Sequence, residues 1–259
     1  MTKILLLLLT FLSGFLFSQK IHVKYTYVRS PIATLNEDLY IEDNKVISRQ
    51  DSIIQFKNLA SSEGNIVAFK KGGNNKAFYC ISNISNIDKK DFFFTSYIKD
   101  PSTDSYFIHD QVSKPIWTID EKSTKMIAGY NCIKATSTFR GSDVTAYFTK
   151  ELPYSAGPFK FFGLPGLILD IRVDNKSYDI WKAEKVELDY KESVNFNPDF
   201  KDFTKLEMKK FIELKDQNLA NNRAIDLKNL PTHIKVDYQM NRFGIEKIFE
   251  WENETETTK

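Results

Sequence analysis

The stretch GPFKFFGLPGLILDI, residues Gly157 to Ile171, sets glycines and prolines inside a run of aromatic and aliphatic residues. Pro165 fixes its own φ angle, and Gly166 accepts the positive φ that other residues resist, which is the pattern of a type II turn. The sequence therefore predicts that LPGL reverses the chain between Leu164 and Leu167, with Gly166 at positive φ and both leucines buried.

A strand is predicted to follow this turn. Its inward face would carry Leu167, Leu169, Ile171 and Val173, and its other face Ile168, Asp170 and Arg172. Two interpretations of the turn stay open: a structural corner, or a binding loop held on a rigid sheet. Either one involves the same six residues, Gly163, Leu164, Pro165, Gly166, Leu167 and Ile168. The glycines match neither the phosphate-loop spacing GxxxxGK[ST] nor the nucleophile elbow GxSxG.

Short runs with alternating apolar residues dominate the rest of the chain, beginning with Ile21 to Val28. One amphipathic helix is expected over residues 204–219, where Thr204 and Glu207 have the spacing of a capping box. We therefore predict an α+β fold with a strongly curved, mainly antiparallel sheet. Its element order is like that of the half-barrel of outer-membrane lipoprotein carriers, a likeness of fold alone.

The ends of the chain predict its destination. Residues 1–18 combine Lys3, an apolar run and Ser18, the pattern of a secretory signal peptide. Residues 19–251 would then form a single domain, and the polar residues 252–259 a disordered tail. We expect an exported protein of the periplasm, the outer-membrane surface or the medium, with no transmembrane segment after signal cleavage.

Cys80 and Cys132 both lie in strand-like runs of a chain predicted to be exported, where disulfides persist. A disulfide between them is one interpretation, and two separately buried thiols are the other. The spacing in the sequence does not decide between them, because bonding depends on the distance between the two Cα atoms.

Composition and motifs limit the function. The chain has 36 basic and 34 acidic residues without a dense basic run, so we expect no nucleic-acid partner. His22, His109 and His233 stand far apart, and adjacent strand residues such as His109 and Asp110 face opposite ways, which disfavours them as a catalytic pair. No HExxH or CxxC motif is present, and we predict no cofactor, no metal site and no catalytic residues, without settling whether the protein is an enzyme.

The quoted stretch resembles the hallmark of the GLPGLI family, exported proteins of Gram-negative bacteria named after the motif at Gly163 to Ile168. The flanks are similar too, at Gly129, Tyr130, Cys132, Ala135, Phe139 to Gly141, and Gly157 with Pro158. The resemblance covers residues 20–220, most firmly 117–171, and departs at Tyr147 and Phe148, where the family usually has Trp-Tyr. The family has no established activity, so the resemblance implies none.

Our leading hypothesis for the function is a non-enzymatic envelope or surface protein that binds a partner or an apolar ligand. The aromatic-rich sheet motivates it, since a concave sheet partly covered by a helix would leave an apolar hollow. One alternative is a hydrolase whose residues converge only in the fold. A second is a structural or assembly factor for an outer-membrane partner.

Overall fold

The computed structural model describes residues 20–51, 53–57, 66–70, 78–84, 88–98, 104–228, 242 and 244–253. The predicted signal peptide at residues 1–18 and His233 lie outside the described residues. The strands are β1 (Ile21–Ser30), β2 (Ala33–Glu42), β3 (Lys45–Gln50), β4 (Ile53–Lys57), β5 (Ile66–Lys70), β6 (Tyr79–Asn83), β7 (Lys89–Tyr97), β8 (Ser105–Ser113), β9 (Thr118–Ile127), β10 (Tyr130–Phe139), β11 (Ser142–Thr149), β12 (Leu167–Val173), β13 (Ile180–Leu188) and β14 (Thr204–Glu207).

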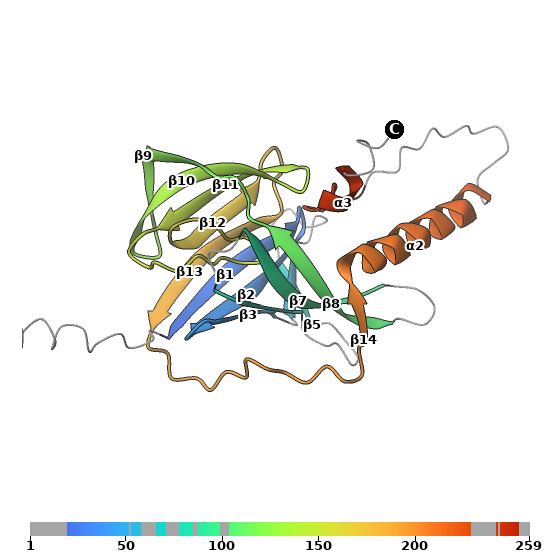
Figure 1. The fold of residues 1–259 in the computed structure, drawn as a ribbon, viewed down its shortest axis with the longest axis horizontal. Helices are drawn as coiled ribbons and strands as arrows, with labels where there is room; N and C mark the ends of the chain where they lie inside the picture. The colour runs from blue at the N-terminus through green and yellow to red at the C-terminus, as the bar shows by residue number, and fades with distance from the viewer. Residues whose placement is uncertain are drawn as a thin grey trace, which may run out of the picture.

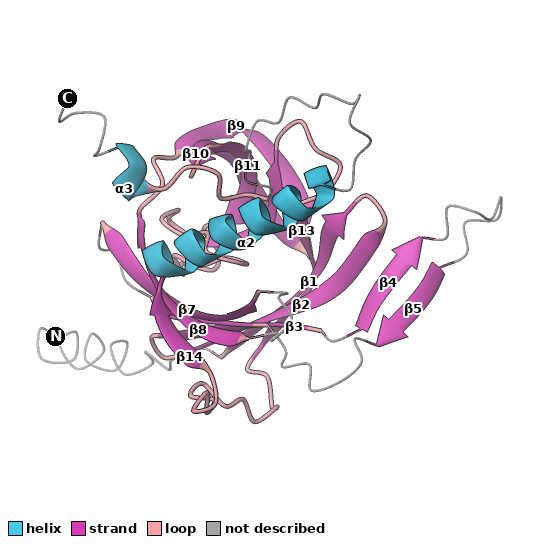
Figure 2. Ribbon diagram, turned by 90° about the vertical axis from the view of Figure 1, so that its right-hand side faces the viewer, coloured by secondary structure: helices cyan, strands magenta, loops and turns pink. Residues whose placement is uncertain are grey.

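These strands form one open, mixed sheet in the order β14-β8-β7-β6-β3-β2-β1-β13-β12-β11-β10-β9, to which β4 and β5 add through β2. All pairings within the described residues are antiparallel except that of β14 with β8. The sheet curves strongly, and helix α2 (Met208–Lys228) runs across the end that faces the viewer in Figure 2. Figure 1 gives the same fold from the side. The predicted α+β class is confirmed.

The predicted start of the helix is wrong. Residues Thr204–Glu207 are extended and pair in parallel with Tyr106 to His109, because the edge of β8 offers them backbone hydrogen-bond partners. The helix begins at Met208 and continues past residue 219 to Lys228. Met208, Phe211 and Ile212 are buried at helical spacing, so the helix is amphipathic as predicted. None of the described helices is long and apolar enough to span a membrane.

The folded chain continues past residue 252, where the polar tail was predicted to begin. A short helix, α3 (Glu250–Asn253), includes Glu252, whose carboxylate accepts hydrogen bonds from the Phe249 amide and from Arg242. Glu252 is therefore held to the folded chain by the two groups it accepts from. The residues from 254 onward lie outside the described residues.

Strand β12 is buried on both faces. Ile168 and Asp170, which alternation placed outward, are 0 % exposed, as are Leu167, Leu169 and Ile171. The sheet curves so tightly here that neighbouring strands cover the second face as well, and Lys125 of β9 reaches Asp170 with an Nζ–Oδ2 distance of 2.8 Å. Period-two alternation identifies the strand but not this second burial.

Residues 189–203 cross the outer face of the sheet from β13 to β14 (Figure 1). The ring of Tyr190 packs edge-on against Tyr40, at a centroid distance of 5.3 Å. Phe200 stacks on Phe107 of β8 at 4.7 Å. These aromatic contacts hold a segment without secondary structure against the strands, so part of the chain's high aromatic content is used on the outside of the sheet.

Candidate functional site

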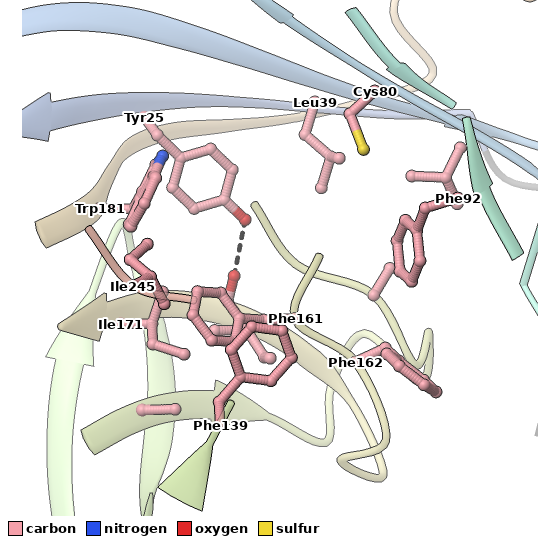
Figure 3. Close-up of a cluster of buried hydrophobic side chains, with 14 of the residues drawn as sticks. Tyr25, Leu39, Cys80, Phe92, Phe139, Phe161, Phe162, Ile171, Trp181 and Ile245 are labelled. Atoms are coloured by element: carbon pink, nitrogen blue, oxygen red, sulfur yellow. Dashed lines mark hydrogen bonds between the residues drawn. The ribbon is translucent and has the colours of Figure 1, made fainter. Parts of the chain in front are cut away.

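Residues 157–168, here called the GLPGLI segment, follow β11 and end in the first two residues of β12; their Phe161 and Phe162 lie on the concave side of the sheet (Figure 3). Its turn is not the predicted one, because Gly166 does not have a positive φ; Gly163 does, at +94°. A Cβ atom on Gly166 would overlap the carbonyl oxygen of Thr149 and lie 2.7 Å from its carbonyl carbon. Glycine is needed at 166 so that two backbone segments can touch, rather than to supply an unusual backbone angle.

The burial predicted for this turn is confirmed. Leu164 is 1 % exposed and Leu167 is 0 % exposed. The Leu167 amide donates to the carbonyl of Leu152, and the Ile168 amide to that of Ala156. The motif therefore ties two passes of the chain together at the start of a core strand, as a structural corner would.

Hydrogen bonds fix the segment to distant strands. Tyr25 of β1 donates its hydroxyl proton to the Ile168 carbonyl at 2.6 Å (Figure 3), and Trp117 donates its indole N–H to the Phe162 carbonyl at 2.9 Å. The Phe159 amide donates to Glu37 of β2. Glu37 is 0 % exposed and also accepts hydrogen bonds from Ser48, Gln50 and Trp181, so this buried carboxylate is well supplied with donors.

Phe161 and Phe162 of the segment pack against strands on both sides of the curved sheet. Phe161 and Phe162 are each 1 % exposed, and Phe161 packs against Phe139 of β10 and Trp181 of β13. Phe162 packs against Phe92 of β7, on the other side of the fold (Figure 3). The chain's own aromatic residues thus bridge the two halves of the sheet, where the sequence predicted an apolar hollow.

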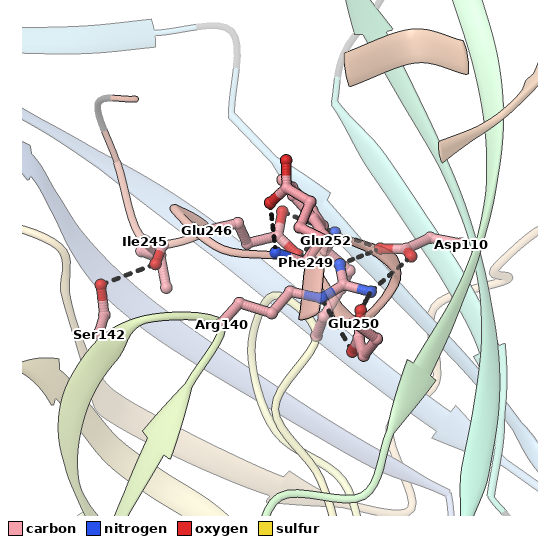
Figure 4. A network of polar contacts seen from close by, with 9 residues as sticks. Asp110, Arg140, Ser142, Ile245, Glu246, Phe249, Glu250 and Glu252 are labelled. Atoms are coloured by element: carbon pink, nitrogen blue, oxygen red, sulfur yellow. Dashed lines mark hydrogen bonds and ion pairs between the residues drawn. The ribbon is translucent and has the colours of Figure 1, made fainter. Parts of the chain in front are cut away.

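A cluster of charged side chains lies beside this segment (Figure 4). One of its members, Arg140, lies in the turn between β10 and β11. Phe139 pairs with Ser142, so Arg140 and Gly141 form a two-residue hairpin loop with φ angles of +43° and +80°. Asn-Gly is the usual sequence for such a loop, and arginine at positive φ is strained. The contacts of the Arg140 side chain offset this cost.

The guanidinium of Arg140 meets three carboxylates. It binds Asp110 of β8 in a bidentate manner, at 2.7 and 2.9 Å, and also contacts Glu246 and Glu250 of the C-terminal segment. The ammonium group of Lys160 lies 2.6 Å from Asp110 Oδ2 and 2.6 Å from Glu246 Oε1. The side chains of Arg140, Lys160 and Asp110 are at most 3 % exposed, so this is a buried ion network.

Contacts within the network shift the pKa values of Asp110 and Arg140. Burial alone would raise the pKa of Asp110, but the charge of Lys160 and the hydrogen bonds from Arg140 outweigh it and hold that pKa well below its usual range. Burial alone would lower the pKa of Arg140, and its hydrogen bonds to Asp110, with the charges of Glu246 and Glu250, raise it instead. Asp110 and Arg140 therefore stay ionised at neutral pH, which favours binding and structure over proton transfer.

Sequence reasoning missed this network. Asp110 was predicted only to face away from His109, which is confirmed: Asp110 lies in the buried network, whereas His109 lies on the outer face. Two signals were present in the sequence. Lys160 interrupts a run of phenylalanines, and Arg140 occupies a hairpin position that favours asparagine.

His109 is held between two carboxylates. Its Nε2 lies 2.9 Å from Asp91 and its Nδ1 lies 2.9 Å from Glu207 of β14. The ring also stacks on Phe93 at a centroid distance of 4.8 Å. Burial alone would lower the pKa of His109, but the hydrogen bonds and charges of the two carboxylates raise it above the usual value. His22 lies apart from it, on β1, and pairs with Asp38.

Cys80 and Cys132 form no disulfide in the structure; both are free and buried. They lie on β6 and β10, with β3, β2, β1, β13, β12 and β11 between those strands in the sheet order. The Cys80 thiol lies 3.6 Å from the Phe159 carbonyl, and Cys132 the same distance from the carbonyl of Tyr130. Burial raises the pKa of each thiol to about 12, so neither is a nucleophile at neutral pH.

Lys90 is a further buried cation on the concave side, besides Arg140 and Lys160. It is 2 % exposed, and its ammonium group lies 5.2 Å from the ring centroid of Phe92 and 5.3 Å from that of Phe162. Burial lowers the pKa of Lys90 to about 8. Within the described part of the chain, no group of three or more His, Cys, Asp or Glu residues has the arrangement of a metal site.

One comparison with known protein families matches the part of the chain that contains this site. A family model described as "Protein of unknown function (Porph_ging)" matches residues 140–170, which begin with Arg140 and include Lys160 and the GLPGLI motif. No curated protein matches the chain. Two solved structures of PNGF-II resemble it, one in the P21 space group and one in the C2 space group.

The P21 structure is 12 % identical, with a TM-score of 0.48, and the match covers 78 % of this chain and 34 % of that one. For the C2 structure the values are 13 %, 0.46, 78 % and 33 %. The chain therefore spans about a third of the length of the solved chains that it matches.

Proposed function

We propose that this chain is a non-enzymatic protein of the bacterial envelope or cell surface that acts by binding a protein partner. We also propose that it is exported through a signal peptide at residues 1–18 and belongs to the GLPGLI family. The motif at Gly163 to Ile168 supports the family proposal, since it lies within the span matched by a family of unknown function.

The packing on the concave side carries this proposal. Phe161 and Phe162 occupy the space in which a carrier would hold an apolar ligand, and they are 1 % exposed. Hydrogen bonds from Tyr25 and Trp117 fix the same segment in place. Displacing it would break those bonds and expose the core, so a protein partner on the surface fits this fold better than an apolar ligand inside it.

The ionisable groups support a non-enzymatic role. Arg140 and Lys160 are neutralised by carboxylates, the two thiols are protonated at neutral pH, and His109 is held between Asp91 and Glu207. A general base or nucleophile needs a pKa matched to its task and access to a substrate. These groups have been arranged instead for charge balance and packing.

Two measurements on one preparation test the proposal. The mature protein, with an affinity tag after Lys259, is cross-linked in the cells that export it and purified, and the same preparation is examined by native mass spectrometry. We expect a protein adduct of fixed stoichiometry that excess untagged protein competes away, and no lipid adduct. A hydrophobic adduct without a protein partner would favour the apolar-ligand function. If neither kind of adduct is found, both the partner-binding and the apolar-ligand function are contradicted.

A further inference from the structure

The C-terminal segment, residues 244–253, binds the rest of the fold in the way that a peptide binds a receptor. It forms no ladder with the described strands. Its backbone is held at the β10–β11 hairpin, where the amides of Lys247 and Ile248 both donate to the Arg140 carbonyl, at 2.8 and 3.1 Å. Ser142 donates its hydroxyl proton to the Ile245 carbonyl at 2.7 Å (Figure 4).

The side chains of this segment contribute two pairs of contacts. Ile245 and Phe249, four positions apart, are 7 % and 1 % exposed and act as apolar anchors. Glu246 and Glu250, also four apart, place their carboxylates on Arg140. Glu246 reaches Lys160 as well. A few apolar anchors combined with charged contacts are the usual elements of peptide recognition.

The cations Arg140 and Lys160, against which residues 244–253 bind, favour an anionic peptide at this position. Of the described carboxylates that contact Arg140 or Lys160, only Asp110 comes from the sheet. Two buried cations facing one carboxylate leave a positive charge in a region shielded from water, and such a charge is costly unless it is paired. Glu246, which contacts both cations, supplies the missing negative charge, and Glu250 adds a second, partly exposed carboxylate at Arg140.

The hairpin is also shaped for this occupant. Gly141 has a φ of +80°, and a Cβ atom placed on it would lie 3.0 Å from Cγ1 of Ile248. Glycine therefore lets the segment approach the hairpin closely. The guanidinium of Arg140 faces the same segment, with its central carbon 4.9 Å from the ring centroid of Phe249.

We infer that Arg140, Gly141 and Lys160 form a recognition site for an acidic peptide with two apolar anchors, and that residues 244–253 are its tethered occupant. The inference rests on the proposed partner-binding function and names the chemistry of one partner: a protein that presents such an acidic segment and replaces the chain's own. The pattern is an apolar residue followed by an acidic one, repeated four positions later with an aromatic anchor.

The test uses the full mature chain with Glu246→Gln and Glu250→Gln together. These amides keep the shape of the segment and remove its charge, so the tethered occupant is weakened. A fluorescein-labelled synthetic peptide of residues 242–253, RFGIEKIFEWEN, is then titrated by fluorescence anisotropy. We expect saturable binding, at least tenfold tighter than for RFGIQKIFQWEN and at least tenfold tighter than to the wild-type chain, whose site is occupied.

A third substitution checks the location. Adding Gly141→Ala to the double variant should weaken peptide binding at least tenfold. If the double variant stays folded by circular dichroism and shows no saturable binding, or binds both peptides equally, the inference is wrong. If the double variant does not fold, hydrogen exchange of the wild-type chain replaces it.

In that measurement, an excess of RFGIEKIFEWEN should speed exchange of the Lys247 and Ile248 amides, and an unchanged rate would overturn the inference. Only purified chain and peptide are present. A negative result here therefore contradicts only the acidic-peptide site. A negative result in the cross-linking experiment contradicts partner binding as a whole.

Discussion

At the scale of single residues, Gly166 shows that a glycine can be required by space rather than by backbone angle. Alanine there would push its Cβ into the Thr149 carbonyl, and backbone cannot move aside as a flexible side chain can. We expect Gly166→Ala to lower the free energy of unfolding by about 2 kcal/mol or more, the upper part of the range for overpacked sites. Thermal and urea unfolding beside the wild type measure this.

Gly129 provides the matched control. Its φ is +88°, and a Cβ atom on it would meet nothing within 4 Å. Gly129→Ala therefore carries only the backbone cost, about 1 kcal/mol. If Gly166→Ala proves no less stable than Gly129→Ala, close approach to Thr149 is not what requires glycine in the motif.

The buried thiols give a second prediction at this scale. Because burial raises the pKa of Cys80 and Cys132 to about 12, the folded protein should resist iodoacetamide at pH 8. In denaturant without reductant, both residues should be alkylated, which intact mass reads directly. Alkylation that occurs only after reduction would show that the exported protein carries the disulfide the structure lacks.

Lys160 allows a test of how much a buried ion network contributes. Lys160→Met keeps most of the side-chain volume but leaves Asp110 and Glu246 with one cation fewer, and breaking such a pair costs about 3 to 5 kcal/mol. The comparison is Lys150→Met, which removes an exposed pair with Glu121 and should cost about 1 kcal/mol or less. Equal losses in chemical denaturation would mean that the buried network stabilises no more than a surface pair.

At the scale of elements, we expect the attachment of β14 to β8 to depend on pH through His109. The carboxylates of Asp91 and Glu207 raise its pKa in the folded state above the unfolded value of about 6.5. A raised folded pKa means that the stabilisation is fully present below the unfolded pKa and is lost as the pH rises through the folded one.

We therefore expect the melting temperature of the wild type to fall by more than that of His109→Gln as the pH rises from about 6.5, the unfolded pKa, through the raised folded pKa. Asp91→Asn removes one of the two carboxylates and should show a smaller fall than the wild type. Parallel melting curves for wild type and His109→Gln across this interval would show that the pair of carboxylates does not act on β14.

The elements also show what the sequence predicts and where it stops. Alternation identified strands such as the run from Ile21 to Val28, because period-two patterns follow from strand geometry itself. The capping pattern failed at Thr204, where the edge of β8 offered backbone partners that outweighed it. Alternation failed at Asp170, since burial on a second face depends on how far the sheet curves.

The charged network was out of reach for the same reason. Asp110, Arg140, Lys160 and Glu246 come from positions between 110 and 246 and meet only because the sheet curves and the C-terminal segment returns to it. Sequence patterns act over one element, whereas these contacts depend on the arrangement of several. Only the odd residue choices at Arg140 and Lys160 marked the site beforehand.

At the scale of the whole molecule, the proposed export predicts the mass of the secreted protein. If residues 1–18 are a signal peptide, the secreted protein should begin at Gln19, which cyclises to pyroglutamate. Intact mass of the protein recovered from the periplasm or medium of an exporting Gram-negative host measures the start. Retention of Met1 would contradict both the cleavage and the proposed route.

The GLPGLI segment also determines how the molecule should unfold. Phe162 packs on β7 and Phe161 on β13, so one short segment joins the two halves of the sheet. Neither half can open without exposing these rings, which couples them into a single cooperative unit. We expect far-ultraviolet circular dichroism and tryptophan fluorescence to give one coincident transition in urea. The first follows the strands, and the second follows Trp117 and Trp181 beside the segment together with Trp251 of α3.

Phe162→Ala tests the cause of this cooperativity. It removes the contact with Phe92 while leaving Phe161 against Trp181, so it should cost about 3 to 5 kcal/mol and loosen β7 from the rest. Its tryptophan and circular dichroism transitions should then separate, with β7 and β8 exchanging amide hydrogens before β12 and β13. If the wild type already shows two separated transitions, the two halves of the sheet fold independently and the segment does not couple them.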